Sequence, residues 1–125
     1  QLTNTSEIDL VIEYLGHDQQ TIFDNWSKYL LVECKNWSGS VGAKQVRDFT
    51  GKMDKTQVDI GVIFARNGVS GDQSGDAIRE IHQYYARTGK MILVVGDTEL
   101  TQLLDGRSFY DLLDDLMYQL RFDST

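Results

Sequence analysis

Short apolar segments alternate with segments of helical periodicity along most of this 125-residue chain, and this alternation limits the fold that it can form. Apolar or alternating residues predict four strands, at residues 8–15, 29–35, 59–66 and 91–95. Helical spacing predicts helices at residues 43–55, 74–88 and 98–104, and a last helix from Phe109 to about Leu120. Strands that alternate with helices favour parallel crossovers, whereas the first two strands can pair antiparallel. The sequence therefore predicts the α/β class, with a central mixed β-sheet flanked by helices.

Two of the predicted helices have a defined apolar face. In the helix at 43–55 this face consists of Val46, Phe49 and Met53. In the helix at 74–88 it consists of Ala77, Ile78, Ile81 and Tyr85. We expect both faces to pack against the sheet, because a helix in a small domain buries its apolar stripe.

Length and composition indicate a single domain over residues 1–125. The chain is 41% hydrophobic and 25% charged, which is ordinary for a globular domain. It lacks a run of about 18 apolar residues, so we expect no membrane span. Its single cysteine, Cys34, lies in an apolar run and is typical of a reduced thiol, which favours the cytoplasm. Because the sequence does not begin with Met, we expect the domain to come from a longer chain.

The net charge of -7 argues against binding nucleic acid through bulk positive charge. The charge is unevenly distributed, however. Residues 28–66 hold seven Lys or Arg and four Asp or Glu, whereas residues 1–27 hold five acids and no base. Any contact with nucleic acid is therefore expected on one face only, and it should be sensitive to salt.

Asp9, Glu33 and Lys35 are the strongest candidates for chemistry. Side chains alternate across a strand, so Glu33 and Lys35 share one face and Cys34 has the other. Two carboxylates supply the hard oxygen ligands that Mg²⁺ requires, and a bound metal activates water and stabilises charge on a phosphate. An ammonium group beside them completes a site suited to phosphodiester hydrolysis.

The alternative interpretation is a surface strand with an ordinary ion pair, worth about 0–1 kcal/mol. The surrounding residues weigh against it. Leu30, Leu31 and Val32 mark a central strand, where charged side chains are costly unless they are paired or functional. Charges inside such a run are typical of functional sites.

The runs Glu33-Cys34-Lys35-Asn36-Trp37 and Val41-Gly42, followed by Val46-Arg47-Asp48-Phe49 and Gly51, resemble the core of Mrr-type restriction endonucleases. That family belongs to the PD-(D/E)xK nuclease superfamily, and the similarity extends over roughly residues 6–106. It implies a restriction-endonuclease-like three-layer sandwich. It also implies that Asp9, Glu33 and the Cys34 backbone carbonyl bind Mg²⁺, for which Mn²⁺ can substitute, and that Lys35 assists the attacking water.

The family's segment begins with a helix before the Asp strand. Only eight residues precede Asp9, so we expect that helix to be missing or shortened. Related nucleases place a glutamine near the start of the following helix, which makes Gln45 a candidate site residue. A solvated helix residue is the simpler interpretation of Gln45.

Three further residues are candidates for contact with nucleic acid. Lys44 and Arg47 would bind phosphates, and Trp37 would stack on a base or sugar. The alternatives are a solvated helix face for the two cations and packing against the sheet for Trp37.

The leading hypothesis is a Mg²⁺-dependent endonuclease that hydrolyses double-stranded DNA, in restriction or defence against foreign DNA. A junction resolvase or an RNA-directed enzyme is a variant of it. The apolar stripe of the last helix is expected to be mostly core, and the residues beside it, Tyr110, Met117 and Tyr118, would allow a homodimer. A fused DNA-reading domain is common in the family. One alternative is a catalytically incomplete module that keeps the nuclease fold and binds nucleic acid or a protein. Another is a different α/β domain, in which the strands at 8–15 and 29–35 are not neighbours.

Overall fold

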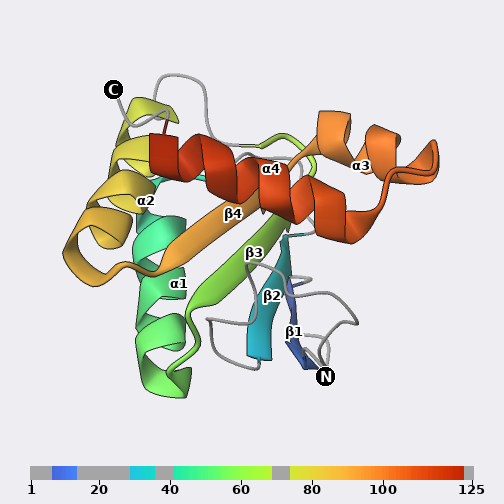
Figure 1. Cartoon of the computed structure of the whole chain (residues 1–125). Helices are drawn as coiled ribbons and strands as arrows, with labels where there is room; N and C mark the ends of the chain where they lie inside the picture. Colours follow the sequence, from blue (N-terminus) through green and yellow to red (C-terminus); the bar gives the residue numbers. More distant parts are fainter. Residues whose placement is uncertain (1–6, 14–28, 36–40, 69–73, 123–125) are drawn as a thin grey trace.

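The computed structural model describes residues 7–13, 29–35, 41–68 and 74–122 of the chain, and Figure 1 shows how their helices and strands are arranged. The elements are β1 (Glu7–Glu13), β2 (Tyr29–Lys35), α1 (Ala43–Thr56), β3 (Ile60–Ala65), α2 (Ser74–Thr88), β4 (Met91–Val95), α3 (Asp97–Leu104) and α4 (Phe109–Phe122). Each predicted element is found, with ends within two residues of the prediction where both ends are described. The family's helix before β1, which we expect to be missing or shortened in this chain, would fall on residues 1–6, outside the described residues.

The four strands form one mixed sheet in the order β1-β2-β3-β4. β1 pairs antiparallel with β2, and Asp9 lies directly opposite Glu33 in the register. β2, β3 and β4 are parallel, with Glu33 opposite Ile63 and Ile63 opposite Val94. The predicted α/β class with a mixed sheet is confirmed. The alternative in which the first two strands are not neighbours is wrong.

Helices cover both faces of the sheet and make three layers (Figure 1). α1 and α2 lie side by side on one face, while α4 crosses the other face. The rings of Phe64 in β3 and Phe109 in α4 stack with centroids 6.0 Å apart, on the face opposite α1. Of the helices that the structure describes, none has both the length and the hydrophobicity of a membrane span.

The close approach of α1 to β3 depends on a glycine. A Cβ atom built on Gly61 would lie 2.4 Å from Phe49 Cε2 and 2.7 Å from Met53 Sδ. Both of those side chains are fully buried, as is Val46, so the predicted apolar face of α1 is confirmed. The missing side chain at Gly61 therefore sets the height at which α1 lies above the sheet.

The two helices on this face are joined by polar contacts along one flank of α1. The Tyr84 hydroxyl donates a hydrogen bond of 2.6 Å to Asp54 Oδ1, and Arg47 pairs with Glu80 at 3.2 Å. Burial raises the pKa of the Tyr84 phenol above its ordinary value, and the hydrogen bond to Asp54 raises it further. Tyr84 therefore stays a neutral donor, and α1 cannot rotate about its axis without breaking these contacts.

The inner face of α2 differs in part from the prediction. Ala77 and Ile81 are buried as expected, but Ile78 is exposed and Tyr85 only half-buried. Tyr84 is buried in their place. The reason is that α2 packs against α1 as well as against β4, which turns its buried stripe toward α1.

We expect the Gly61→Ala substitution to lower the free energy of unfolding by about 2 kcal/mol, because the added methyl group overpacks the contact between α1 and β3. The matched control is Gly51→Ala in α1, where a Cβ meets nothing within 4 Å. Alanine there should stabilise the helix by about 0.5–1 kcal/mol. Urea denaturation of the three proteins measures both effects. Equal stability of the two variants would contradict the role given to Gly61.

Candidate active site

Strand β2 brings a carboxylate and an ammonium group together on its α1 side. Glu33 and Lys35 are two residues apart, so both side chains point to the same face. The Glu33 side chain is only 2% exposed and that of Lys35 only 5%. Lys35 Nζ lies 2.7 Å from Glu33 Oε2. The two strongest candidates in the sequence therefore form a buried ion pair.

A second ammonium group reaches the same carboxylate from helix α1. Lys52 Nζ lies 2.5 Å from Glu33 Oε1 and donates a hydrogen bond to it. Lys52 immediately precedes Met53, which packs against β3, and it lies on the flank of α1 that faces away from α2. Because α1 is fixed by Phe49, Met53 and Gly61, this flank overhangs β2 at the level of Glu33.

Two cations on one buried carboxylate form a strongly polar centre in an otherwise apolar sheet. Moving an unpaired carboxylate out of water costs several kcal/mol, so a buried glutamate needs charged partners. Each oxygen of Glu33 has its own ammonium group, at hydrogen-bonding distance. The arrangement fixes Glu33 as an ionised acceptor whose two oxygens both face positive charge.

The register of the sheet adds a second acid at the same level. Asp9 in β1 is directly opposite Glu33, and directly opposed residues of an antiparallel pair have Cβ atoms about 4.5–5.5 Å apart. The side chain of Asp9 lies outside the described residues. Among side chains that are described, no three His, Cys, Asp or Glu come together as a metal site. The donor chemistry still fits a hard divalent cation, because carboxylate oxygens are the ligands that such cations prefer and both oxygens of Glu33 are placed against positive charge.

Gln45 and Cys34 lie near this centre in different ways. Gln45 precedes Lys52 by seven residues, two helical turns, so the two share one side of α1. Its side-chain oxygen accepts a hydrogen bond of 2.9 Å from the Gly42 N–H, which caps the start of α1. Cys34 lies between Glu33 and Lys35 and is half-buried. Neither the proposed role of Gln45 nor that of the Cys34 carbonyl is tested by these contacts.

The residues predicted to contact nucleic acid lie elsewhere on α1. Lys44 pairs with Asp48 at 3.2 Å, and Arg47 pairs with Glu80 of α2, on the side away from Glu33. Both cations are exposed. Trp37 lies outside the described residues.

Sequence reasoning missed Lys52, although a signal was present. The buried residues of α1 are Val46, Phe49 and Met53, and a helical projection places both Gln45 and Lys52 on one flank of that stripe. The apolar stripe shows which residues of α1 lie on its two flanks. It does not show which flank faces β2, because this depends on how α1 packs against α2.

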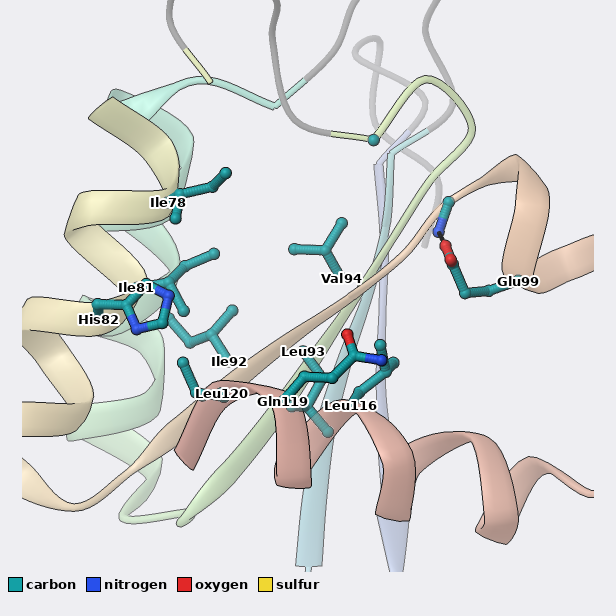
Figure 2. A pocket seen from close by; sticks show the side chains of 12 residues that line it. Ile78, Ile81, His82, Ile92, Leu93, Val94, Glu99, Leu116, Gln119 and Leu120 are labelled. Atoms are coloured by element: carbon teal, nitrogen blue, oxygen red, sulfur yellow. Dashed lines mark hydrogen bonds between the residues drawn. The ribbon is translucent and has the colours of Figure 1, made fainter. Parts of the chain in front are cut away.

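A separate apolar hollow of about 400 Å³ lies at the β4 edge of the sheet, and Figure 2 shows its lining. Its walls come from α2, β4 and α4, with Ile78, Ile81, His82, Ile92, Val94, Leu116, Gln119 and Leu120 among them. Glu99 at its rim accepts a hydrogen bond of 2.7 Å from the Gly96 N–H. Val94 is two strands away from Glu33, so the hollow and the charged centre are distinct places.

Comparison with known proteins points to one family. A family model named Mrr_cat, described as "Restriction endonuclease", matches residues 1–113, which include every element up to the first turn of α4. Among curated proteins, none matches this chain.

We expect Glu33→Gln to lower the free energy of unfolding by about 3 kcal/mol, because it leaves two ammonium groups, one of them buried, without their shared anion. The matched control is Glu80→Gln, which removes the exposed partner of Arg47 and should cost under about 1 kcal/mol. Denaturation in urea, with EDTA present, measures the two values. If Glu33→Gln were no more destabilising than Glu80→Gln, the ion-pair centre would not hold the structure together.

Proposed function

The chain belongs to the Mrr-type restriction endonuclease family, and we propose that it is a divalent-metal-dependent endonuclease that hydrolyses phosphodiester bonds of DNA at Glu33 and Lys35. The observation that carries the proposal is the buried Glu33 carboxylate held by two ammonium groups opposite Asp9 in the sheet. A purely structural role would be served as well by apolar residues, because replacing a buried ion pair with them is often neutral or stabilising.

The metal would be held by Glu33 and Asp9, with the Cys34 backbone carbonyl as a third oxygen donor. Mg²⁺ is the expected ion, and Mn²⁺ the expected substitute. When bound, such a cation lowers the pKa of water and stabilises negative charge on phosphate. Carboxylate and carbonyl oxygens are the ligands that both ions prefer.

The chain's own residues would orient the reaction. Lys35 is buried and held by Glu33, so its ammonium group has a fixed position from which to contact the attacking water or a phosphate oxygen. Gln45 lies on the same side of α1 as Lys52, and its amide nitrogen is the group that could reach the site, because its oxygen caps α1. Positive charge at this centre would attract the phosphate and stabilise the pentavalent transition state.

DNA contact would extend from the site onto the exposed side of α1. Lys44 and Arg47 would bind phosphates, and Trp37 would stack on a base or sugar. A homodimer and a fused DNA-reading domain stay predictions. Tyr118 and Phe122 on α4 are exposed and pack against each other, which gives a homodimer an apolar contact. Restriction or defence against foreign DNA is the process we propose for such an activity.

The catalytic proposal is tested by nicking of supercoiled plasmid in Mg²⁺ or Mn²⁺. We expect Glu33→Ala and Lys35→Ala each to lower the rate about 10²-fold or more, because they remove a metal ligand and a transition-state charge. Asp76→Ala and Lys55→Ala, both outside the site and outside the proposed DNA contacts, are the matched controls and should keep the wild-type rate. EDTA should abolish cutting by the wild type.

The outcome also separates the proposal from its main alternative. Equal nicking by all five proteins would show that the cutting does not come from this site. Binding of DNA without cutting in any metal would identify a module that keeps the nuclease fold but lacks catalysis.

The proposed DNA contacts have their own test. Lys44→Ala combined with Arg47→Ala should weaken binding of a duplex uniformly across sequences and lower the slope of log K against log salt by about 2. The control is Arg79→Ala with Arg87→Ala, which removes the same charge from α2. Fluorescence anisotropy of a labelled duplex at several salt concentrations gives both slopes. An identical loss of duplex affinity in both double variants would contradict specific contacts by Lys44 and Arg47, because it would show that only the total charge matters.

A further inference from the structure

Lys52 is distinguished from Lys35 by its exposure. Both ammonium groups touch Glu33, at 2.5 and 2.7 Å, but the Lys52 side chain is 38% exposed and that of Lys35 is 5% exposed. Lys35 cannot turn from Glu33 into water, because its side chain is almost wholly buried. Lys52 can swing its flexible stem into water and keep its charge solvated. Of these two cations, Lys52 is the exchangeable one.

The contact between Lys52 and Glu33 is not needed to hold α1 in place. Phe49 and Met53 already fix the height of the helix over Gly61, and Asp54 fixes its rotation through Tyr84. An additional ion pair also has an entropic cost, because it orders a long side chain. What Lys52 adds is charge compensation at the Glu33 oxygen that faces α1.

We propose that Lys52 is a positioning residue, a resident counter-ion that holds the Glu33 carboxylate before a divalent cation binds and is displaced from Oε1 when it does. The inference rests on the metal-binding part of the proposed function. A monovalent ammonium group and a divalent cation compete for the same oxygen, so the chain keeps its carboxylate ionised and oriented at the expense of metal affinity. Lys35 stays on Oε2 in both states.

The measurable consequence is the direction in which the affinity for Mn²⁺ changes when Lys52 is replaced, because a merely structural lysine would give the opposite change. Without Lys52, a divalent cation no longer has to displace an ammonium group, and a unit of positive charge is removed from the site. We expect Lys52→Gln to tighten Mn²⁺ binding about tenfold, the scale of an outer-shell change at a metal site. Lys52→Arg keeps the charge and should stay close to the wild type. A structural contact would instead loosen Glu33 and weaken binding.

The test is isothermal titration of each protein with MnCl₂ alone, without DNA, at one pH and ionic strength. Lys55→Gln is the matched control, since it removes the same charge from an exposed position of α1 and should change the dissociation constant less than about twofold. Thermal unfolding gives a second readout. In EDTA, Lys52→Gln should melt below Lys55→Gln, and saturating Mn²⁺ should close or reverse that gap.

The inference is overturned if Lys52→Gln binds Mn²⁺ no more tightly than the wild type, or if Lys52→Arg behaves like Lys52→Gln. It is also overturned if neither the wild type nor Lys52→Gln binds Mn²⁺. Lys52→Met replaces Lys52→Gln if the latter fails to fold, with the same expected result. Tighter Mn²⁺ binding by Lys52→Gln together with no DNA cutting by the wild type would support the inference and overturn the nuclease proposal alone.

Discussion

The buried carboxylate of Glu33 requires charged partners, and strand β2 and helix α1 are arranged so that they supply them. A carboxylate with a 2% exposed side chain in a central parallel strand is tolerable only with charged partners at contact distance. One partner, Lys35, comes from the same strand and needs no tertiary structure beyond the alternation of side chains. The other, Lys52, comes from a helix, so its position depends on how that helix docks. Glu33 thus links the local geometry of β2 to the packing of α1.

The docking of α1 is in turn fixed by its apolar stripe and by the flank that faces α2. Its apolar stripe lies on β3, where Gly61 leaves room for the ring of Phe49. One flank is joined to α2 through the hydrogen bond from Tyr84 to Asp54. The opposite flank carries Lys52 over β2. A helix with only an apolar stripe could roll or slide over the sheet by a few ångströms, but the polar contacts with α2 prevent this and so place Lys52 beside Glu33. Precise placement of a polar group by rigid elements is what a catalytic site requires.

Much of this could be predicted from local pattern, because local pattern determines much of the fold. The alternation in β1 and the apolar run of β2 predicted two strands that can pair antiparallel, and the structure pairs them with Asp9 directly opposite Glu33. The face shared by Glu33 and Lys35 followed from their spacing alone. The inner face of α1 was equally clear, because Val46, Phe49 and Met53 are the apolar residues at helical spacing there.

What could not be predicted depends on the relative placement of helices. Ile78 and Tyr85 belong to the apolar stripe of α2 by spacing, yet the contact with α1 turned that stripe so that Tyr84 is buried. The same contact decided which flank of α1 faces β2, and therefore that Lys52 and not Arg47 reaches Glu33. Sequence periodicity shows roughly which side of a helix faces the core. The exact rotation of the helix about its axis is set by contacts with elements that lie far away in the sequence.

The charged groups of α1 and of the strand beneath it fall into two classes by burial. This division suits the nuclease that we propose, which would bind both a metal and a polyanion. Lys44 and Arg47 are paired with Asp48 and Glu80 at the surface, where such pairs are worth about 0–1 kcal/mol and are screened by salt. The phosphates of DNA could therefore replace Asp48 and Glu80 as partners of these two cations at a small cost in free energy. Glu33 is different, because its partners hold a desolvated charge that screened, distant ions cannot replace. Only a cation that enters the site and offers more charge than an ammonium group can compete for it. The net negative charge of the whole chain would affect the approach of DNA at long range, but it would have little bearing on either of the two proposed exchanges.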